Sequence, residues 1–180
     1  DVRDMSQSEL RGRISYVPQK AWLFSGTVKD NLLHGDPLAS EEEMDRILSV
    51  AQADFVRNLE RGLASPVSQG GTNFSGGQKQ RLSIARALMK KGDIYIFDDS
   101  FSALDFKTDA ALRKALKAET EDSAVLIIAQ RINTILSADR IIVLEDGKIA
   151  GMGAHSQLMK SCPVYQDIAR SQMKGEDIDG

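Results

Sequence analysis

The sequence predicts one α/β domain built on a mainly parallel β-sheet, and two observations lead to this fold class. Short apolar runs of strand length alternate with segments of helical periodicity almost from end to end. No internal repeat or low-complexity linker divides the 180 residues. Continuous apolar strands are typical of parallel sheets, because helices cover such sheets on both faces. We therefore expect one α/β unit whose sheet lies between layers of helices.

The first half of the chain contains one clear strand and two helices. Residues 13–18 form a short run closed by proline, which predicts a strand. Ser40 stands where a helix N-cap is expected and Glu43 completes the capping-box spacing, so a helix should run over about 40–59. A glycine-rich turn then leads to a second helix that begins near Ser75.

The second half again alternates strands and helices. Three runs are continuous apolar strands, namely 94–97, 125–128 and 141–144. The last run is followed by Glu-Asp-Gly-Lys, which is a good hairpin turn because glycine accepts positive φ. Helices are expected over about 105–117 and 156–171.

Composition argues against several classes of protein. Hydrophobic residues make up 42% and charged residues 27%, and the net charge is -3, as in ordinary globular domains. A nucleic-acid binder normally shows a basic face, so we expect no nucleic-acid partner. The longest apolar stretch, 124–129, is too short to span a bilayer, so any membrane role needs another segment or chain. The single cysteine, Cys162, allows no intrachain disulfide, and the opening at Asp1 without a leader suggests an excised fragment.

The most specific signal lies in residues 73–81, Asn-Phe-Ser-Gly-Gly-Gln-Lys-Gln-Arg. A serine and two glycines open a helix there, so bare backbone N–H groups and a hydroxyl lie at the positive end of the helix dipole. Such an end suits a phosphate. Ser-Gly-Gly alone would be explained by an N-cap followed by flexible glycines, whereas the nine residues together favour the anion site.

The apolar run at 94–97 ends in two acids, Asp98 and Asp99. A carboxylate at the carboxyl end of a buried parallel strand points into the crevice where ligands of such sheets bind. There it can hold Mg²⁺, directly or through water, beside a triphosphate. An aspartate-rich turn would give a similar pattern. The spacing from 73–81, and the sequence Ser-Ala-Leu-Asp at 102–105, favour the magnesium site.

Together these segments resemble the ATP-binding cassette (ABC) transporter family, and in particular its multidrug and lipid exporters. Residues 16–19 and 23–28 resemble the family's Q-loop region, and 73–81 resemble its signature motif. Residues 94–99 resemble the Walker B strand, and 102–105 resemble the D-loop. The resemblance covers essentially the whole chain and keeps the family's order of motifs.

This resemblance implies a fold, a domain layout and partners. The fold is a recA-like core with an inserted α-helical signature subdomain at about 20–90, while 1–19 and 91–172 form the core and 173–180 a polar tail. Two nucleotide-binding domains form a head-to-tail dimer that encloses ATP and Mg²⁺. Transmembrane domains contact the Q-loop region, which puts the domain at the cytoplasmic face of the cell membrane.

The resemblance also implies roles for individual residues. Asp98 is expected to hold Mg²⁺ through water, and Gln19 to reach both that ion and the membrane domain. Asp99 is expected to act as the base for the attacking water and Gln130 to contact the γ-phosphate, so that with Gln19 they form the catalytic set. The residues expected to act on the partner's nucleotide or across the dimer are Ser75, Gly76, Gly77, Gln78 and Asp105.

Three departures from the family pattern matter. No Gly-x-x-x-x-Gly-Lys-Ser/Thr loop occurs in the sequence, so the Walker A part of the domain is missing and the fragment alone should be inactive. The base position holds Asp99 where the family has glutamate, which draws the carboxylate back by roughly 1 Å. The switch position holds Gln130 where the family has histidine, and glutamine gains no charge near pH 7.

We therefore expect an ATPase domain that powers export, with a degenerate ATP site in one half of a heterodimer rather than in a homodimer. Two alternatives stay open. One is a non-catalytic or weakly catalytic regulatory half that binds ATP and holds a dimer together. The other is a soluble cassette ATPase acting on DNA or ribosomes. The histidines, His34 and His155, are expected at surface or capping positions, and Trp22 and Phe24 against the helical subdomain.

Overall fold

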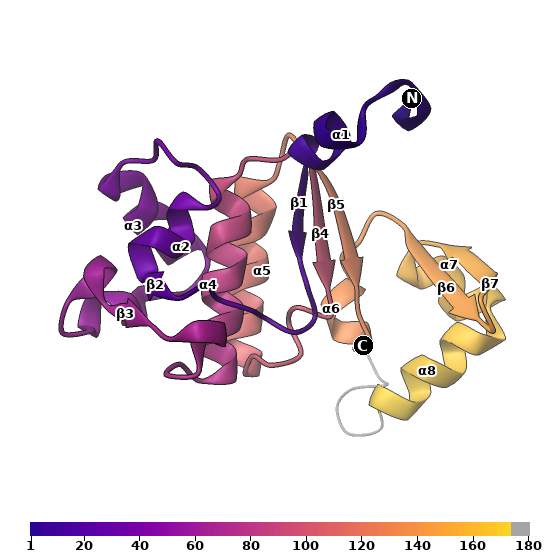
Figure 1. Cartoon of the computed structure of the whole chain (residues 1–180). Helices are drawn as coiled ribbons and strands as arrows, with labels where there is room; N and C mark the ends of the chain where they lie inside the picture. Colours follow the sequence, from indigo (N-terminus) through magenta and orange to yellow (C-terminus); the bar gives the residue numbers. More distant parts are fainter. Residues whose placement is uncertain (174–180) are drawn as a thin grey trace. The chain divides into compact units, whose positions relative to one another are not determined.

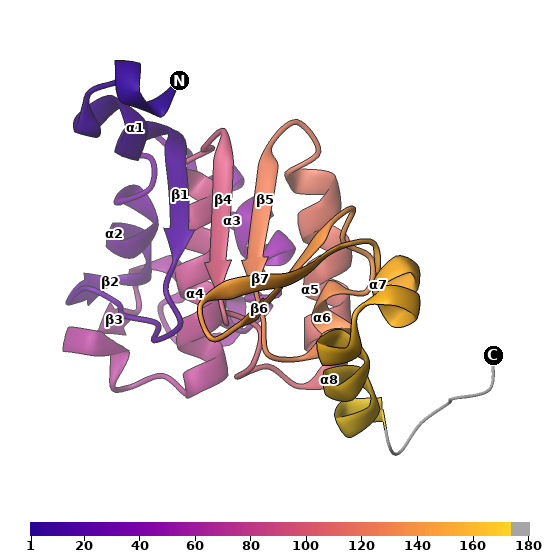
Figure 2. The same cartoon turned by 90° about the vertical axis from the view of Figure 1, so that its right-hand side faces the viewer.

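A three-stranded parallel sheet organises the first part of the chain. The computed structural model describes residues 1–173 and divides the chain into unit 1, Asp1–Ile128, and unit 2, Ala129–Gly180. In unit 1 the strands lie in the order β1-β4-β5 and run parallel (Figures 1 and 2). Their bounds are Ile14–Val17 for β1, Ile94–Asp98 for β4 and Ala124–Ile128 for β5. Because all three strands run the same way, their carboxyl ends meet at one edge of the sheet.

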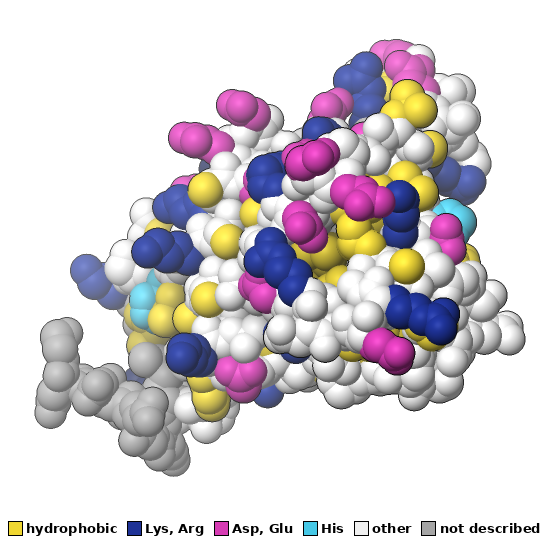
Figure 3. Space-filling model, turned by 90° about the vertical axis from the view of Figure 1, so that its left-hand side faces the viewer, with side chains coloured by type: hydrophobic (Ala, Val, Ile, Leu, Met, Phe, Trp, Pro, Cys, Tyr) yellow, Lys and Arg dark blue, Asp and Glu magenta, His cyan; other side chains and the backbone are white. Residues whose placement is uncertain are grey.

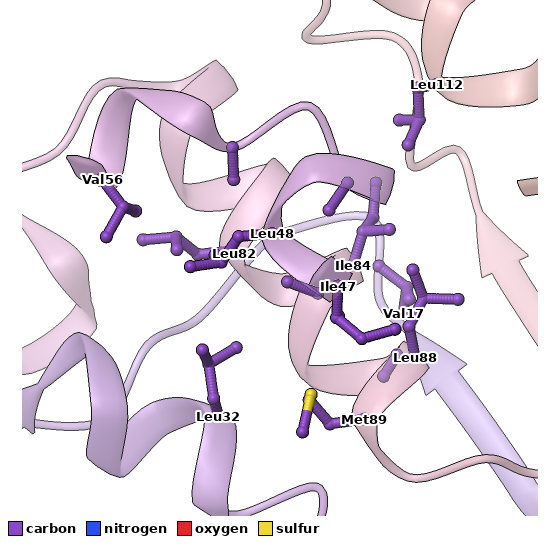
Figure 4. Packing of buried hydrophobic residues seen from close by; sticks show 14 of the residues in the cluster. Val17, Leu32, Ile47, Leu48, Val56, Leu82, Ile84, Leu88, Met89 and Leu112 are labelled. Carbon is purple, nitrogen blue, oxygen red and sulfur yellow. The ribbon is translucent and has the colours of Figure 1, made fainter. Parts of the chain in front are cut away.

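Helices cover one face of this sheet (Figure 1). The alternation of side chains along the strands sends Ser15, Val17, Tyr95 and Phe97 to that face, and all four are buried. The apolar sides of the helices, apart from the first one in the chain, pack into the same core, part of which is drawn in Figure 4. The helices of unit 1 are α1 Gln7–Arg13, α2 Val28–Leu33, α3 Glu41–Val50, α4 Gly76–Met89 and α5 Phe106–Glu119.

The opposite face is not covered by the helices of unit 1. In the edge strand β5, Leu126 and Ile128 lie on this opposite face and are 49% and 46% exposed. Helices were expected on both faces of the sheet, whereas the helices of unit 1 cover one face of it (Figure 1). Apolar composition predicts that a strand forms, but it does not show whether the described chain supplies a second layer.

Unit 2 has its own apolar cluster. Strands β6 Ile141–Glu145 and β7 Lys148–Gly153 form an antiparallel hairpin, and the φ angles of Asp146 and Gly147, 50° and 74°, make its turn. The predicted hairpin is therefore confirmed. Helices α6 Ile132–Ile135, α7 His155–Ser161 and α8 Pro163–Met173 complete this unit, and Leu158, Cys162 and Tyr165 belong to its buried cluster.

Two predicted helices end earlier than expected. The helix expected over 40–59 stops at Val50, because Gln52 adopts a left-handed φ of 56° and the chain continues as a short 3₁₀-helix, Asp54–Asn58. The last helix is split before Pro163, which lacks the N–H group needed to continue α7 and instead begins α8. The helices α1 and α2 were not predicted, since six or seven residues carry too little periodicity.

The smaller elements are short turns and a two-stranded antiparallel pair: 3₁₀-helices Val2–Asp4, Gly62–Ala64 and Gln69–Gly71, and strands β2 Gly26–Thr27 and β3 Pro66–Val67. Most of the predicted polar tail, residues 174–180, lies outside the described residues. Across residues 1–173, the helices are too short or too polar to cross a bilayer. On the face drawn in Figure 3, basic and acidic side chains are interspersed, so this face carries no basic patch.

Candidate functional site

The two acids expected to carry chemistry lie at the carboxyl edge of the parallel sheet. Asp98 is the last residue of β4, and Asp99 follows it in a left-handed conformation with a φ of 42°. Aspartate tolerates this conformation better than most residues do. The Asp99 backbone N–H donates to the Ile128 carbonyl oxygen over 2.8 Å, which ties the turn to the end of β5. This backbone hydrogen bond therefore fixes the position of the Asp99 main chain, from which the second carboxylate extends.

Strand β1 and the residues after it hold both acids. The Tyr16 hydroxyl donates to Asp98 Oδ2 over 2.9 Å, and Gln19 Nε2 donates to Asp99 Oδ2 over 3.1 Å. The hydrogen bond to Asp98, with a smaller effect of burial, raises the pKa of Tyr16, so the phenol stays a neutral donor at ordinary pH. The predicted site residues Gln19, Asp98 and Asp99 are thus brought together in unit 1.

A buried serine adds a further link between the same two strands. Ser100 is fully buried, and its hydroxyl donates to the Val17 carbonyl oxygen over 3.1 Å. This link fixes the turn that follows Asp99 against the end of β1. Tyr16 and Ser100 were not singled out as functional residues from the sequence. Side-chain alternation in two parallel strands could have predicted that Tyr16 and Asp98 lie on the same face of the sheet. The pairing register of the strands is also needed to predict that these two side chains meet.

The signature segment, residues 73–81, opens α4 as predicted. Ser75 is the N-cap: its Oγ accepts from the Gln78 N–H over 3.3 Å, and its own N–H donates to Gln78 Oε1 over 2.9 Å. Ser75 and Gly76 are exposed, and a Cβ placed on Gly76 would meet nothing within 4 Å. The helix therefore presents an accessible, positively polarised end. In this structure two of its hydrogen-bonding groups are used within the capping box.

The D-loop residues lie next to this helix end. A Cβ placed on Gly77 would lie 3.3 Å from the Ala103 carbonyl oxygen, so glycine permits the close approach. Asp105 is exposed and caps α5, with its carboxylate accepting from the Thr108 N–H and hydroxyl over 3.0 and 2.7 Å. These hydrogen bonds lower the pKa of Asp105. Asp105 thus has a structural role as a helix cap, and its cross-dimer role remains a prediction.

Gln130 belongs to unit 2 and is described with that unit alone. Its side chain is exposed, and its carbonyl oxygen accepts from Gln172 Nε2 over 2.7 Å. Asp99 belongs to unit 1, so the role of Gln130 at the γ-phosphate stays a prediction. In the same unit, His155 lies within 2.8 Å of the Tyr165 hydroxyl through Nδ1.

The acids offer the oxygen ligands that Mg²⁺ prefers, but too few for a site made of protein groups alone. Across residues 1–173, no three His, Cys, Asp or Glu side chains gather into a metal-binding group. Magnesium sites beside nucleotides commonly use one or two carboxylates together with phosphate oxygens and water. Asp98, with Asp99 beside it and the Gln19 amide within reach of the second acid, fits that pattern.

Comparisons with known proteins show the family to which the chain belongs. The family model described as ABC transporter matches residues 1–102. An uncharacterized ABC transporter ATP-binding protein of Mycobacterium tuberculosis is 46% identical over 184 residues, covering 100% of this chain and 31% of the relative. A multidrug export ATP-binding/permease protein of Staphylococcus aureus is 40% identical over 169 residues, covering 93% of this chain and 29% of the relative.

One solved structure is similar over nearly the whole chain. It is that of a bacterial Atm1-family ABC exporter with ATP bound, with a TM-score of 0.92, 35% identity, and coverage of 96% of this chain and 30% of that chain. The chain thus spans about a third of the length of the proteins it matches.

Proposed function

The chain belongs to the ABC transporter family, and we propose that it is part of a nucleotide-binding domain that powers export of a substrate across a membrane. The observation that carries this proposal is the pair Asp98 and Asp99 at the carboxyl edge of the sheet, with Gln19 hydrogen-bonded to the second acid. A metal ligand, a base and a Q-loop residue are thereby within reach of one nucleotide. Relatives named for export and multidrug export support the direction of transport.

ATP with Mg²⁺ is the proposed cofactor pair. Asp98 would hold the ion through water, and Gln19 would turn its amide oxygen towards it. When bound, Mg²⁺ neutralises charge that develops on the phosphates. Asp99 would accept a proton from the attacking water, and Gln130 would donate a hydrogen bond to the γ-phosphate. Because Asp99 is one methylene shorter than glutamate and Gln130 stays neutral, this proposed ATP site turns over slowly.

The signature segment would complete the ATP site of a second nucleotide-binding domain. Ser75, Gly76, Gly77 and Gln78 present backbone N–H groups and a hydroxyl at the exposed end of α4. A γ-phosphate at this end would replace the internal contact between Ser75 and Gln78 with hydrogen bonds to the nucleotide. Asp105 would make its contact across the same interface. Because its signature is intact, this chain would supply these groups to the active site of the partner.

These features favour a heterodimer over a homodimer. In a homodimer, both ATP sites would carry Asp99 and Gln130 and both would be slow. In a heterodimer, the partner supplies a full base to the site that this chain's signature completes. The same two residues also support a second candidate function, a regulatory half that binds ATP and barely hydrolyses it.

A groove in unit 1 supports contact with a transmembrane domain. It has a volume of about 550 Å³ and lies beside the free edge of β1, with Phe24, His34 and Arg86 among its lining residues. Trp22 and Phe24 stay 48% and 46% exposed, although both also contact the helical segment as expected. Tyr16 and Phe24, which belong to the Q-loop region, are among its lining residues. A membrane-domain segment bound there would hold this domain at the cytoplasmic face of the membrane.

Steady-state hydrolysis of Mg-ATP tests the proposal. The measurement compares wild type with the double variant Asp99→Glu, Gln130→His, in the full-length protein, which should include the phosphate-binding loop absent from these residues. The protein is prepared without the proposed partner, so that every ATP site carries residues 99 and 130 of this chain. We expect slow wild-type turnover and a rise of at least tenfold in the double variant, in keeping with the usual contribution of a general base. Fast wild-type turnover that the double change leaves unaltered would contradict the degenerate-site proposal. No turnover in either protein would favour the regulatory half.

A further inference from the structure

We propose that Tyr16 is a positioning residue for the metal-binding carboxylate, with its hydroxyl holding Asp98 Oδ2 so that Oδ1 faces the ion or its water. This inference rests on the proposed role of Asp98 towards Mg²⁺. It adds to the site a residue that does not touch nucleotide or metal itself. The contact that carries it is the hydrogen bond of 2.9 Å from the Tyr16 hydroxyl to Asp98 Oδ2.

The sheet register explains why this tyrosine reaches this acid. Tyr16 pairs with Ile96 in the parallel ladder between β1 and β4. Asp98 lies two residues further along β4 and therefore on the same face of the sheet as Ile96. The phenol spans that diagonal, and it does so from a strand that Ser100 ties to the turn after β4 through the Val17 carbonyl oxygen. The donor and the acceptor are thus held by one rigid pair of strands.

The position of the ring separates this role from core packing. Tyr16 lies on the face opposite the helices and is 52% exposed, whereas its neighbours Ser15 and Val17 are buried under α4. The other β1 side chain on the exposed face is Ile14, which is apolar. An apolar residue at position 16 would serve packing on this face as well as tyrosine does. The hydroxyl is what distinguishes tyrosine at this place, and it is directed at the carboxylate.

The neutral charge of the donor matters for the metal. A lysine or arginine at this distance would repel a divalent cation, whereas a phenol orients the carboxylate without adding positive charge. Mg²⁺ demands a strict octahedral arrangement, so a carboxylate that is held in advance loses less entropy on binding. Hydrogen bonds that orient metal ligands typically contribute about 10- to 100-fold to metal affinity.

Metal binding to the full-length protein tests the inference apart from turnover. Mn²⁺ serves as the probe, and its free concentration is read by electron paramagnetic resonance with a saturating non-hydrolysable ATP analogue. Tyr16→Phe removes one oxygen atom from a half-exposed ring, and we expect it to raise the Kd for Mn²⁺ about tenfold. Binding of the analogue in EDTA should stay at the wild-type level, which also shows that the site is folded.

Three further variants make each outcome informative. Tyr95→Phe changes a ring on the helix-covered face and should leave Mn²⁺ binding unchanged. Tyr16→Leu should weaken Mn²⁺ as much as Tyr16→Phe does, whereas a Kd in Tyr16→Phe equal to that of the wild type overturns the inference. Asp98→Asn should lose Mn²⁺ binding. If Asp98→Asn binds Mn²⁺ normally, the proposed role of Asp98 fails, and the positioning role fails with it.

Discussion

Serine residues at two helix N-termini form the same side-chain cap in different surroundings. Ser75 begins α4 in the signature segment, and Ser40 begins α3 away from it. In each, Oγ accepts a backbone N–H three residues later, over 3.3 Å for Ser75 and 3.2 Å for Ser40. The two caps should therefore contribute equally to the stability of the fold. Comparing the same substitution at both serines separates a function of Ser75 from its contribution to stability.

Replacing each serine by alanine makes that comparison. We expect Ser75→Ala and Ser40→Ala each to lower the free energy of unfolding by about 1 kcal/mol, because each removes one cap. Only Ser75→Ala should also reduce ATP turnover of the full-length protein, since its hydroxyl would face the partner's nucleotide in the proposed dimer. The measurements are chemical denaturation and steady-state hydrolysis. Equal turnover in the two variants would show that Ser75 is a cap and nothing more.

A cluster of ion pairs at the surface makes part of the stability depend on pH. Glu43 pairs with Arg46 over 2.8 Å and with Lys91 over 3.0 Å, and these partners lower its pKa to about 2. Because the folded-state pKa lies below that of the unfolded chain, the stabilisation is complete above about pH 4.5. It is lost as the pH falls towards 2. Glu43 was expected to close a capping box, and these partners are what its side chain binds instead.

Glu43→Gln should therefore destabilise the domain at pH 7 and lose this effect in acid. Glutamine keeps the size of the side chain but removes the charge that Arg46 and Lys91 bind. The melting temperatures of wild type and variant, measured from pH 7 down to pH 3, should converge as the pH falls below 4.5. A difference that stays constant over this range would mean that the ion pairs do not stabilise the fold.

At the scale of elements, α2 and α4 approach each other closely at a glycine. A Cβ placed on Gly35, just after α2, would clash with the Arg86 carbonyl oxygen in α4. Backbone atoms of a helix cannot move aside cheaply, so the two helices would have to separate. Gly12, inside α1, offers the opposite case, because a Cβ there would meet nothing within 4 Å.

Alanine substitutions at the two glycines should shift stability in opposite directions. Gly35→Ala should cost about 1–3 kcal/mol through overpacking. Gly12→Ala should stabilise by up to about 1 kcal/mol, because alanine loses less backbone entropy in a helix. Denaturant unfolding of the nucleotide-binding domain extended to full length checks both values. If Gly35→Ala is as stable as wild type, the close packing of α2 on α4 is not as described.

Strand type and helix starts could be predicted from the sequence, whereas exposure and long-range contacts could not. The runs at 94–97 and 125–128 became β4 and β5, and Ser40 and Ser75 became N-caps, because these signals are local. The exposure of β5 depends on which segments lie beside it, which periodicity does not encode. Likewise, the hydrogen bond from Tyr16 to its acid depends on the register of two distant strands.

At the scale of the molecule, the proposed site depends on more than this chain. The sequence carries a complete signature at one end of α4 and a Walker B strand that ends in the shorter acid. In a head-to-tail dimer these two parts would belong to different ATP sites. The signature would serve the partner's fast site, and Asp99 would serve the slow one. The two parts should therefore respond unequally to mutation.

Single changes in the assembled transporter test this asymmetry. Gly77→Asp puts a negatively charged side chain at the end of α4, and its Cβ would lie 3.3 Å from the Ala103 carbonyl oxygen. We expect this variant to reduce ATP turnover by about 100-fold or more. Asp99→Asn should reduce it less than about twofold, since this carboxylate contributes little to the total if its site is already slow. Steady-state hydrolysis by the purified full-length complex measures both. In a homodimer, each variant would alter both sites, and Asp99→Asn would abolish turnover as fully as Gly77→Asp does. That outcome would replace the heterodimer with a symmetric exporter in which aspartate is a sufficient base.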